Sequence, residues 1–313
     1  MKIVITDGYT LNPGDLSWSP FGQLGEVIYF DRSSPLETPG RCREAGVIIT
    51  NKTPITEETI ASAVQLKLIA VTATGYNVVD IDAAKKRKVP VCNVPVYGTD
   101  SVAQHTFALL LELTNQVGRH TESVKAGDWA QSLDWCYSKS PLLELRDKTI
   151  GIIGFGRIGR QVANLATAFG MKVIFFDKND STDDERAVSL ESLFERSDVI
   201  SLHCPLTMEN HGFIDQRLLS TMKPGAFLIN TSRGQLINEA DLADALRTLG
   251  GAALDVLTHE PPPAHHPLSA FPNCIITPHM AWLSKEARGR IMETTLENVR
   301  LGIAGKPRYV VNP

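Results

Sequence analysis

The sequence has no long apolar segment and no excess of positive charge. In its 313 residues no apolar stretch approaches the roughly 20 residues of a membrane-spanning helix, so we expect no membrane association. The formal net charge is -4, and no basic run is long. Because nucleic-acid binding depends on dense positive charge, we expect no nucleic-acid partner.

Cysteine is scarce and unpatterned. The chain has 5 cysteines, which are scattered and free of CxxC spacing. This usage is typical of reduced thiols in a cytoplasmic protein. The first residues, MKIVITDG, begin a predicted strand and do not resemble a signal peptide. The adjacent His265 and His266 lie between prolines without the spacing of a metal site, so we expect no metal.

What the chain does have is two series of short apolar runs separated by helical segments. The first series begins at Lys2, and the second begins at Lys148 with the runs KTIGIIGF, MKVIFFD, SDVISLH, AFLINTS, GAALDV and NCIITP. Such alternation predicts parallel sheets covered by helices on both faces. The second series has the pattern of a doubly wound nucleotide-binding sheet.

The order of these segments predicts two α/β domains, one inserted into the other. A substrate (lid) domain would comprise residues 1–98 and 286–313, and a dinucleotide-binding domain would comprise residues 99–285. A long connecting helix is expected from Ser101, as its cap, to His120. Gln104 and His105 are interpreted as packing residues of this helix. The terminal segment KPRYVVNP is expected to pack back on the first domain.

A glycine-rich loop follows the first strand of the second series. Its glycines fit G-x-G-x-x-G, with a strand before, a helix after and Asp177 ending the next strand roughly 20 residues on. The predicted cofactor-binding residues are Gly154, Phe155, Gly156, Arg157, Ile158, Gly159 and Asp177. The helix N-terminus can bind a pyrophosphate. Asp177 can accept hydrogen bonds from a ribose diol and would repel a 2′-phosphate. The pattern therefore favours NAD(H) over NADP(H), although Lys178 weakens that preference.

Polar groups follow the later strands of the same series. Arg233, Asp255, Glu260 and His279 stand at or just beyond the strand ends, where open α/β sheets bind ligands. Each has a plain alternative, because Arg233 could pair with Glu239, Glu260 could be solvated and His279 could be a core histidine. Their shared location favours a site that reduces a 2-oxo acid by hydride transfer. Arginine would bind the carboxylate, histidine would supply the proton and glutamate would orient it.

At these residues the chain resembles the D-isomer-specific 2-hydroxyacid dehydrogenase family. The matching motifs are GIIGFGRIGR, SLHCPLTMEN, LINTSRGQLINEADL, ALDVLTHEPPP and ITPHMAW, and ATGYNVVDIDAA extends the match into the first domain. The details resemble its hydroxypyruvate reductase (glycerate dehydrogenase) branch most. Formate dehydrogenases of this superfamily carry glutamine where Glu260 stands, which argues against that branch.

The resemblance implies a fold, a catalytic set and a cofactor site. It implies a flavodoxin-like lid domain and a Rossmann NAD-binding domain, with Arg233, Glu260 and His279 as the catalytic residues. It places the backbone of Thr74 and Gly75 against the substrate carboxylate. The further cofactor-binding residues that it implies are His203, Cys204 and Pro205 on the adenine side, Thr231, and Asp255 facing the nicotinamide amide.

The resemblance also implies an assembly and a substrate class. Family members form homodimers through the cofactor domain, and residues 128–145 would be the arm that embraces the partner, with Trp135 directed toward the neighbour's site. The expected reaction is NAD(P)H-dependent reduction of hydroxypyruvate or glyoxylate to D-glycerate or glycolate. The alternatives are a D-lactate-type or aromatic 2-oxo acid reductase, and a non-catalytic NAD-responsive protein like the corepressors that share this fold.

Overall fold

The chain divides into two compact units. The computed structural model describes residues 1–178 and 184–313. The first unit holds Met1–Gly98 and Trp282–Pro313, and the second holds Thr99–Ala281. The chain returns from the second unit to the first after Ala281, which is earlier than the expected boundary after residue 285. Trp282 explains the difference, since it is buried in the core of the first unit with its ring edge-on to Tyr97, 6.2 Å between centroids.

The first unit is built on a parallel sheet of 5 strands in the order β2-β1-β3-β4-β5. The strands are β1 (Lys2–Ile5), β2 (Glu26–Tyr29), β3 (Ala45–Thr50), β4 (Leu68–Val71) and β5 (Val91–Cys92). All of β3 and β4 is buried, as continuous apolar runs in a sheet covered on both faces require. This strand order is the flavodoxin-like one, which confirms the predicted fold of this domain.

Helices cover this sheet, and the C-terminal segment completes it. The helices are α1 (Gly8–Leu11), α2 (Thr38–Cys42), α3 (Glu57–Ser62), α4 (Ile81–Lys86) and α11 (Lys285–Ile303), with a 3-10 turn η1 (Ser19–Gln23). At the chain end Val311 donates its backbone N–H to the carbonyl of Val91 at 2.9 Å. The side chain of Asn312 bonds the backbone of Val91 and of Val89. The predicted return of KPRYVVNP to the first domain is confirmed.

The second unit is built on a parallel sheet of 6 strands in the order β11-β10-β9-β8-β6-β7. The strands are β6 (Thr149–Ile153), β7 (Lys172–Phe176), β8 (Val199–Leu202), β9 (Phe227–Asn230), β10 (Gly251–Leu254) and β11 (Cys274–Ile276). A parallel bridge between Phe175 and Ala187 continues the pairing beyond β7. The chain winds in opposite directions from β6, so the switch point of this Rossmann sheet lies between β6 and β8.

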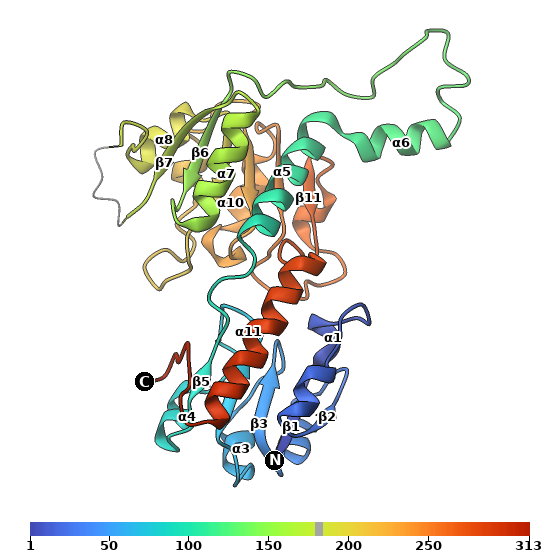
Figure 1. Ribbon diagram of the computed structural model, residues 1–313. Coiled ribbons are helices and arrows are strands. Elements are labelled where there is room, and N and C mark those ends of the chain that lie inside the picture. The colour runs from blue at the N-terminus through green and yellow to red at the C-terminus, as the bar shows by residue number, and fades with distance from the viewer. Residues whose placement is uncertain (179–183) are drawn as a thin grey trace. The chain divides into compact units, whose positions relative to one another are not determined.

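The helices of the second unit depart from the prediction at one place. They are α5 (Thr99–Asn115), α6 (Val117–Lys125), α7 (Arg157–Ala168), α8 (Leu190–Arg196), α9 (Gln216–Leu219) and α10 (Glu239–Ala245), with 3-10 turns η2 (Gly234–Leu236) and η3 (Pro267–Ala270). The single helix expected from Ser101 to His120 was wrong. Gln116 adopts the left-handed conformation (φ 46, ψ 45), which ends α5 and starts α6. In Figure 1, α6 and the chain after it project from this unit.

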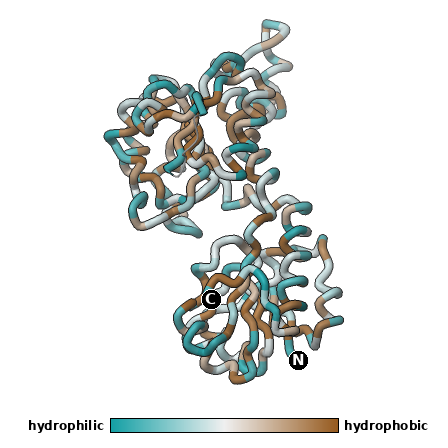
Figure 2. Tube along the Cα trace, turned by 60° about the vertical axis from the view of Figure 1, so that its left-hand side comes forward, coloured by the Kyte–Doolittle hydropathy of each residue, from teal (hydrophilic) through white to brown (hydrophobic). Residues whose placement is uncertain are grey.

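Each sheet has a hydrophobic core on each of its faces. In the second unit Ile150 and Ile152 of β6 pack with α5 and α7, whereas Ile153 packs on the other face with residues of α8, α9 and α10. Figure 2 shows the hydrophobic segments gathered inside each unit. Among the helices in residues 1–178 and 184–313, none is long and apolar enough to cross a membrane.

All cysteines are free thiols, and they differ in exposure. Cys42 and Cys92 are buried, Cys204 and Cys274 are half-buried, and Cys136 is exposed on the segment after α6. Burial raises the pKa of Cys42 and Cys274 to about 12. Burial also raises the pKa of Cys92 and Cys204 to about 11. These buried and half-buried thiols are therefore protonated at neutral pH.

Candidate active site

The glycine loop lies at the carboxyl end of β6, at the switch point of the sheet. Gly154 has φ 92, and a Cβ there would lie 2.6–2.7 Å from the backbone of His203 and Cys204, so a side chain is excluded. A Cβ on Gly159 would lie 2.2 Å from the carbonyl oxygen of Gly154, so this glycine lets α7 pack against the loop. A Cβ on Gly156 would meet no atom within 4 Å. Of these three glycines, Gly156 is the one that faces open space, at the N-terminus of α7, where a phosphate could bind.

Asp177 stands directly beside this loop. It follows the last residue of β7, and its Oδ2 accepts a hydrogen bond from the backbone N–H of Phe155 at 2.7 Å. The neighbouring Lys178 forms an ion pair with Glu209, and both side chains are exposed. The carboxylate is therefore fixed at the second strand end, where a ribose hydroxyl can reach it, while the lysine charge is balanced by a glutamate.

His203 and Cys204 follow β8, on the other side of the glycine loop. The His203 N–H donates to the carbonyl of Ile153 at 2.7 Å, and its ring Nε2 lies 2.8 Å from Ser201 Oγ. Burial lowers the pKa of His203 to about 3, so its ring is neutral at physiological pH. The His203 imidazole is therefore neutral and the Cys204 thiol protonated, so this part of the surface carries no charge. The exposed Pro205 follows them and adds no charge either.

The turn after β9 presents Arg233 to solvent. Asn230 is fully buried, donates its side-chain amide to the carbonyl of Arg233 at 2.8 Å and accepts the N–H of Ser232 at 2.9 Å. Within the described chain, Arg233 forms no ion pair, and its guanidinium bonds only the carbonyl of Ser232. Glu239, the alternative partner, instead accepts from Thr258 N–H and contacts His266. The guanidinium is thus held out on a fixed turn without a carboxylate partner.

Gly234 brings this turn against the loop that carries Glu260. A Cβ at position 234 would lie 2.0 Å from the backbone carbon of Leu257 and 2.4 Å from the nitrogen of Thr258. No side chain fits in that space. Gln235 also donates to the Thr258 carbonyl at 3.0 Å. The exposed Arg233 is therefore followed directly by a residue that must be glycine, because only glycine lets this turn lie against the backbone of the loop that carries Glu260.

Glu260 and His279 form a hydrogen-bonded pair. His279 Nδ1 lies 2.5 Å from Glu260 Oε2, and both side chains are partly exposed. Glu260 Oε1 accepts the N–H of Leu257 at 3.0 Å, which fixes the carboxylate. Because a carboxylate can only accept, Nδ1 carries a hydrogen and Nε2 is the nitrogen left to exchange a proton. A histidine with one nitrogen oriented by a carboxylate has the geometry of a general acid-base.

Asp255 connects the loops of this site. It is 1% exposed, and its carboxylate accepts from Thr277 Oγ1 at 2.6 Å, Met280 N at 2.9 Å and Ala281 N at 2.8 Å. Its backbone N–H donates to Asn230, and its carbonyl accepts from His279. The expected contact of this carboxylate with the nicotinamide amide stays a prediction. Its hydrogen bonds connect the end of β10 to the ends of β9 and β11.

The remaining expected residues lie just after β9 and in the first unit. Thr231 follows β9, and its hydroxyl lies 3.3 Å from that of Thr106 on α5. Thr74 and Gly75 follow β4 in the first unit, where Thr74 Oγ1 donates to the carbonyl of Val94 at 2.9 Å. In residues 1–178 and 184–313, no group of three or more His, Cys, Asp or Glu side chains is arranged to hold a metal.

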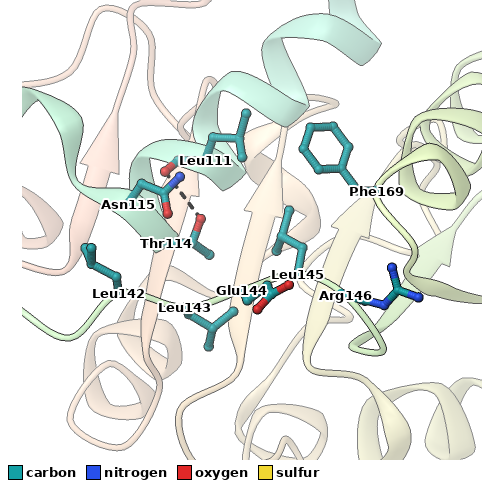
Figure 3. A pocket seen from close by; sticks show the side chains of 9 residues that line it. All are labelled: Leu111, Thr114, Asn115, Leu142, Leu143, Glu144, Leu145, Arg146 and Phe169. Carbon is teal, nitrogen blue, oxygen red and sulfur yellow. Dashed lines mark hydrogen bonds between the residues drawn. The ribbon is translucent and has the colours of Figure 1, made fainter.

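Two hollows lie away from these strand ends. One of about 470 Å³ is shown in Figure 3, between the end of α5 and the returning segment, and it is lined by Leu111, Thr114, Asn115, Leu142, Leu143, Glu144, Leu145, Arg146 and Phe169. The other, of about 400 Å³, is lined by Asn115 at the end of α5, by residues of α6, and by Tyr137 and Leu142. Both lie beside α6 or the segment that follows it, and neither is lined by an expected site residue.

Comparison with known proteins agrees with this geometry. Residues 107–281 match the model of the "D-isomer specific 2-hydroxyacid dehydrogenase, NAD binding domain". A hydroxypyruvate reductase of Blautia hydrogenotrophica is 45% identical over 321 aligned positions, covering 100% of both chains. The chain belongs to the D-isomer-specific 2-hydroxyacid dehydrogenase family.

Other members of the family extend the match. A glycerate dehydrogenase of Methylorubrum extorquens is 40% identical over 89% of both chains. The crystal structure of the TT0316 protein from Thermus thermophilus superposes with a TM-score of 0.90 at 34% identity, covering 99% of this chain and 100% of that one. The two-domain α/β architecture predicted for this dehydrogenase is confirmed.

Within this dehydrogenase the second unit gathers most of the expected residues at one sheet edge. Sequence reasoning had not identified Asn230, Gly234 or Thr277 as parts of the site. A signal was present for two of them: a buried strand that ends in asparagine, and a glycine directly after a candidate anion-binding arginine. Nothing in the sequence connects Thr277 to Asp255, because their contact depends on how two strand ends meet.

Proposed function

We propose that this dehydrogenase reduces hydroxypyruvate or glyoxylate to D-glycerate or glycolate with NAD(H). The observation that carries the proposal is the His279–Glu260 pair at 2.5 Å, on strand ends neighbouring the turn that holds Arg233. The identities of 45% and 40% to enzymes named hydroxypyruvate reductase and glycerate dehydrogenase support this substrate class.

The residues at the switch point fit a dinucleotide. The open backbone at Gly156, the N-terminus of α7 and Asp177 would hold it, with Phe155, Arg157 and Ile158 completing the loop. Cys204, Pro205 and Thr231 lie at the neighbouring strand ends. When bound, NADH supplies a hydride. The carboxylate of Asp177, and the Glu209 partner of Lys178, favour NAD(H) over NADP(H), because both oppose an added 2′-phosphate.

The catalytic roles follow from the geometry of three side chains. Arg233 would bind the substrate carboxylate, because its guanidinium has no carboxylate partner within the described chain and matches that group with two parallel hydrogen bonds. His279 would give a proton from Nε2 to the carbonyl oxygen of the substrate and take it back in the reverse reaction. Glu260 would hold the ring and stabilise its charged form. The backbone of Thr74 and Gly75 would contact the carboxylate from the lid domain.

We also propose that the enzyme is a cytoplasmic homodimer. Free thiols throughout the chain are consistent with a reducing compartment. The segment 128–145 exposes Leu133, Trp135 and Leu142, with Trp135 90% exposed, beside the hollow in Figure 3. Such apolar exposure is typical of a surface that a partner covers. A monomer by sedimentation at micromolar concentration, still fully active, would contradict this arm and the approach of Trp135 to a neighbour's site.

The substrate is tested with NADH and NADPH against hydroxypyruvate, glyoxylate, pyruvate, phenylpyruvate and 2-oxoisocaproate. We expect the highest kcat/KM with hydroxypyruvate or glyoxylate and with NADH. Turnover of only the bulky acids would keep the mechanism and change the substrate. Tight NADH binding without turnover of any acid would contradict the proposal.

A further inference from the structure

The backbone of the proposed proton donor is in an unusual conformation. His279 has φ 51, in the left-handed region that a residue with a Cβ rarely adopts. Its N–H is shared between the carbonyl oxygens of Asp255 at 2.8 Å and Thr277 at 2.9 Å. The next two N–H groups, of Met280 and Ala281, donate to the Asp255 carboxylate. Three consecutive amides are thus held by one residue, and such support is what a strained conformation needs to persist.

Asp255 is in turn supported from α5. Thr277 Oγ1 lies 2.6 Å from Asp255 Oδ1, and His105 Nε2 lies 3.2 Å from Thr277 Oγ1. Since the carboxylate only accepts, the Thr277 hydroxyl donates to it, and the hydroxyl oxygen is left to accept from the Nε2–H of His105. His105 is thereby the outer donor of a directional chain, His105 to Thr277 to Asp255, and its Nε2 also lies 3.5 Å from Asp255 Oδ1 itself.

The N-terminal part of α5 contacts the same loop a second time. Ser101 lies one helical turn before His105, on the same face, and its hydroxyl donates to the carbonyl of Ala281 at 2.7 Å. Ala281 is therefore held at its N–H by Asp255 and at its carbonyl by Ser101. These contacts hold the loop at both ends of residues 277–281.

The chain also keeps Asp255 charged. Burial by itself raises the pKa of this carboxyl, but the hydrogen bonds from His105, Thr277, Ala281 and Met280 outweigh it, and the pKa lies below its ordinary value. An ionised carboxylate binds backbone amides more strongly than a neutral acid does. Removing the outer donor weakens the group on which the loop depends.

We propose that His105 is a positioning residue, which through Thr277 and Asp255 fixes the loop that orients His279. The inference rests on the proposed function, because it assigns His279 as the proton donor. His105 itself contacts neither substrate nor cofactor in this role. Its task is geometric, and misplacement of an acid-base group by about 1 Å is enough to lower turnover substantially.

Kinetics of matched variants test this role. We expect His105→Leu to lower kcat for hydroxypyruvate by about 10- to 100-fold, with the KM and the Kd for NADH within about twofold. His105→Gln, whose amide nitrogen can still donate to Thr277, should keep kcat within about threefold. Thr277→Val removes the relay but leaves the direct approach of His105 to Asp255, so the loss of kcat in the double variant should be smaller than the product of the two single losses. The exposed neighbour Gln104→Leu on α5 is the control.

Amide hydrogen exchange tests the same inference without turnover. In His105→Leu the amides of residues 279–281 should exchange faster, while those of the glycine loop, residues 154–159, should not change. Because this readout needs no substrate, it separates failure of this inference from failure of the proposed function. Wild-type kcat together with wild-type exchange in His105→Leu would overturn the proposal. Equal impairment of the Leu and Gln variants would also overturn it, and if the Leu variant does not fold, the Gln and Thr277→Val variants decide.

Discussion

Arg233 is a cation at the end of a buried strand, and its turn is fixed by Asn230 rather than by an ion pair. Replacing it with alanine should lower kcat/KM by a factor equivalent to about 2–5 kcal/mol, with a higher KM and a lower kcat, because the substrate carboxylate loses its charged partner. Steady-state kinetics with hydroxypyruvate measure this. Arg217→Ala, which removes an exposed arginine of α9, is the control. An unchanged kcat/KM for Arg233→Ala would make the arginine structural.

In the proposed mechanism, Glu260 acts through its hydrogen bond to His279 Nδ1. The variant Glu260→Gln keeps the shape but removes the charge that stabilises the protonated ring, so kcat should fall by about 100-fold. The NADH Kd should stay unchanged, since Glu260 lies beyond β10 and the cofactor loop lies beyond β6. Glu191→Gln on α8 serves as the matched control. Equal kcat values for the two variants would remove Glu260 from the mechanism.

At this scale the sequence predicted the positions of the proposed catalytic residues better than it predicted their contacts. Arg233, Glu260 and His279 could be placed at one sheet edge because each follows an apolar strand, and parallel strands end at one edge. The role of Asp255 could not be foreseen, because its hydrogen bonds to Met280 and Ala281 depend on a left-handed backbone at His279. No residue pattern in the sequence predicts a left-handed backbone at this histidine.

Among the elements, the contact of η2 with the loop after β10 leaves no room for a side chain at Gly234. A Cβ at position 234 would overlap the backbone of Leu257 and Thr258, so Gly234→Ala should lower the free energy of unfolding by about 1–3 kcal/mol. It should also reduce kcat/KM, because it separates the turn of Arg233 from the loop of Glu260. Chemical denaturation and kinetics measure the two effects.

The control for this substitution is Gly40→Ala on α2. Gly40 has no neighbour within 4 Å of an added Cβ, and alanine there should stabilise the protein by up to about 1 kcal/mol. If Gly234→Ala behaved like Gly40→Ala, the close approach at Gly234 would not limit the site.

The strands were predicted more reliably than the helix ends. Each apolar run of the second series became a strand. The central strands β6, β8, β9 and β10 are buried almost throughout, as their unbroken apolar sequences predict. The break at Gln116 was missed because glutamine is an ordinary helix residue, and nothing local indicates its left-handed conformation. Ser101 was predicted as the helix cap, but α5 already begins at Thr99, and the Ser101 hydroxyl donates instead to the carbonyl of Ala281, which is far away in the sequence.

For the whole molecule, the burial of His203 makes stability depend on pH. Its pKa falls from the ordinary value of 6.5 to about 3 in the folded state, so between these values the unfolded chain binds a proton that the folded chain does not. The free energy of unfolding should therefore decrease as the pH is lowered through this window, by up to about 1.4 kcal/mol per pH unit.

The upper part of that window isolates the histidine. Carboxylates whose pKa is lowered, such as Asp15 at about 2, lose their contribution only at lower pH. Denaturant titrations between about pH 5 and 6.5 should show a shallower slope for His203→Asn than for the wild type. The exposed His265→Asn should leave this slope unchanged. A parallel pair of curves for wild type and His203→Asn would contradict the assignment.

Because the thiols differ in exposure, the enzyme offers one natural cysteine for chemical labelling. With Cys42 and Cys92 enclosed and Cys204 and Cys274 half-covered, a maleimide dye at neutral pH should attach once per chain, at the exposed Cys136. That cysteine stands beside Trp135, on the segment proposed to embrace a second copy. A dye placed there would report, through its fluorescence and without any engineered residue, when two chains come together.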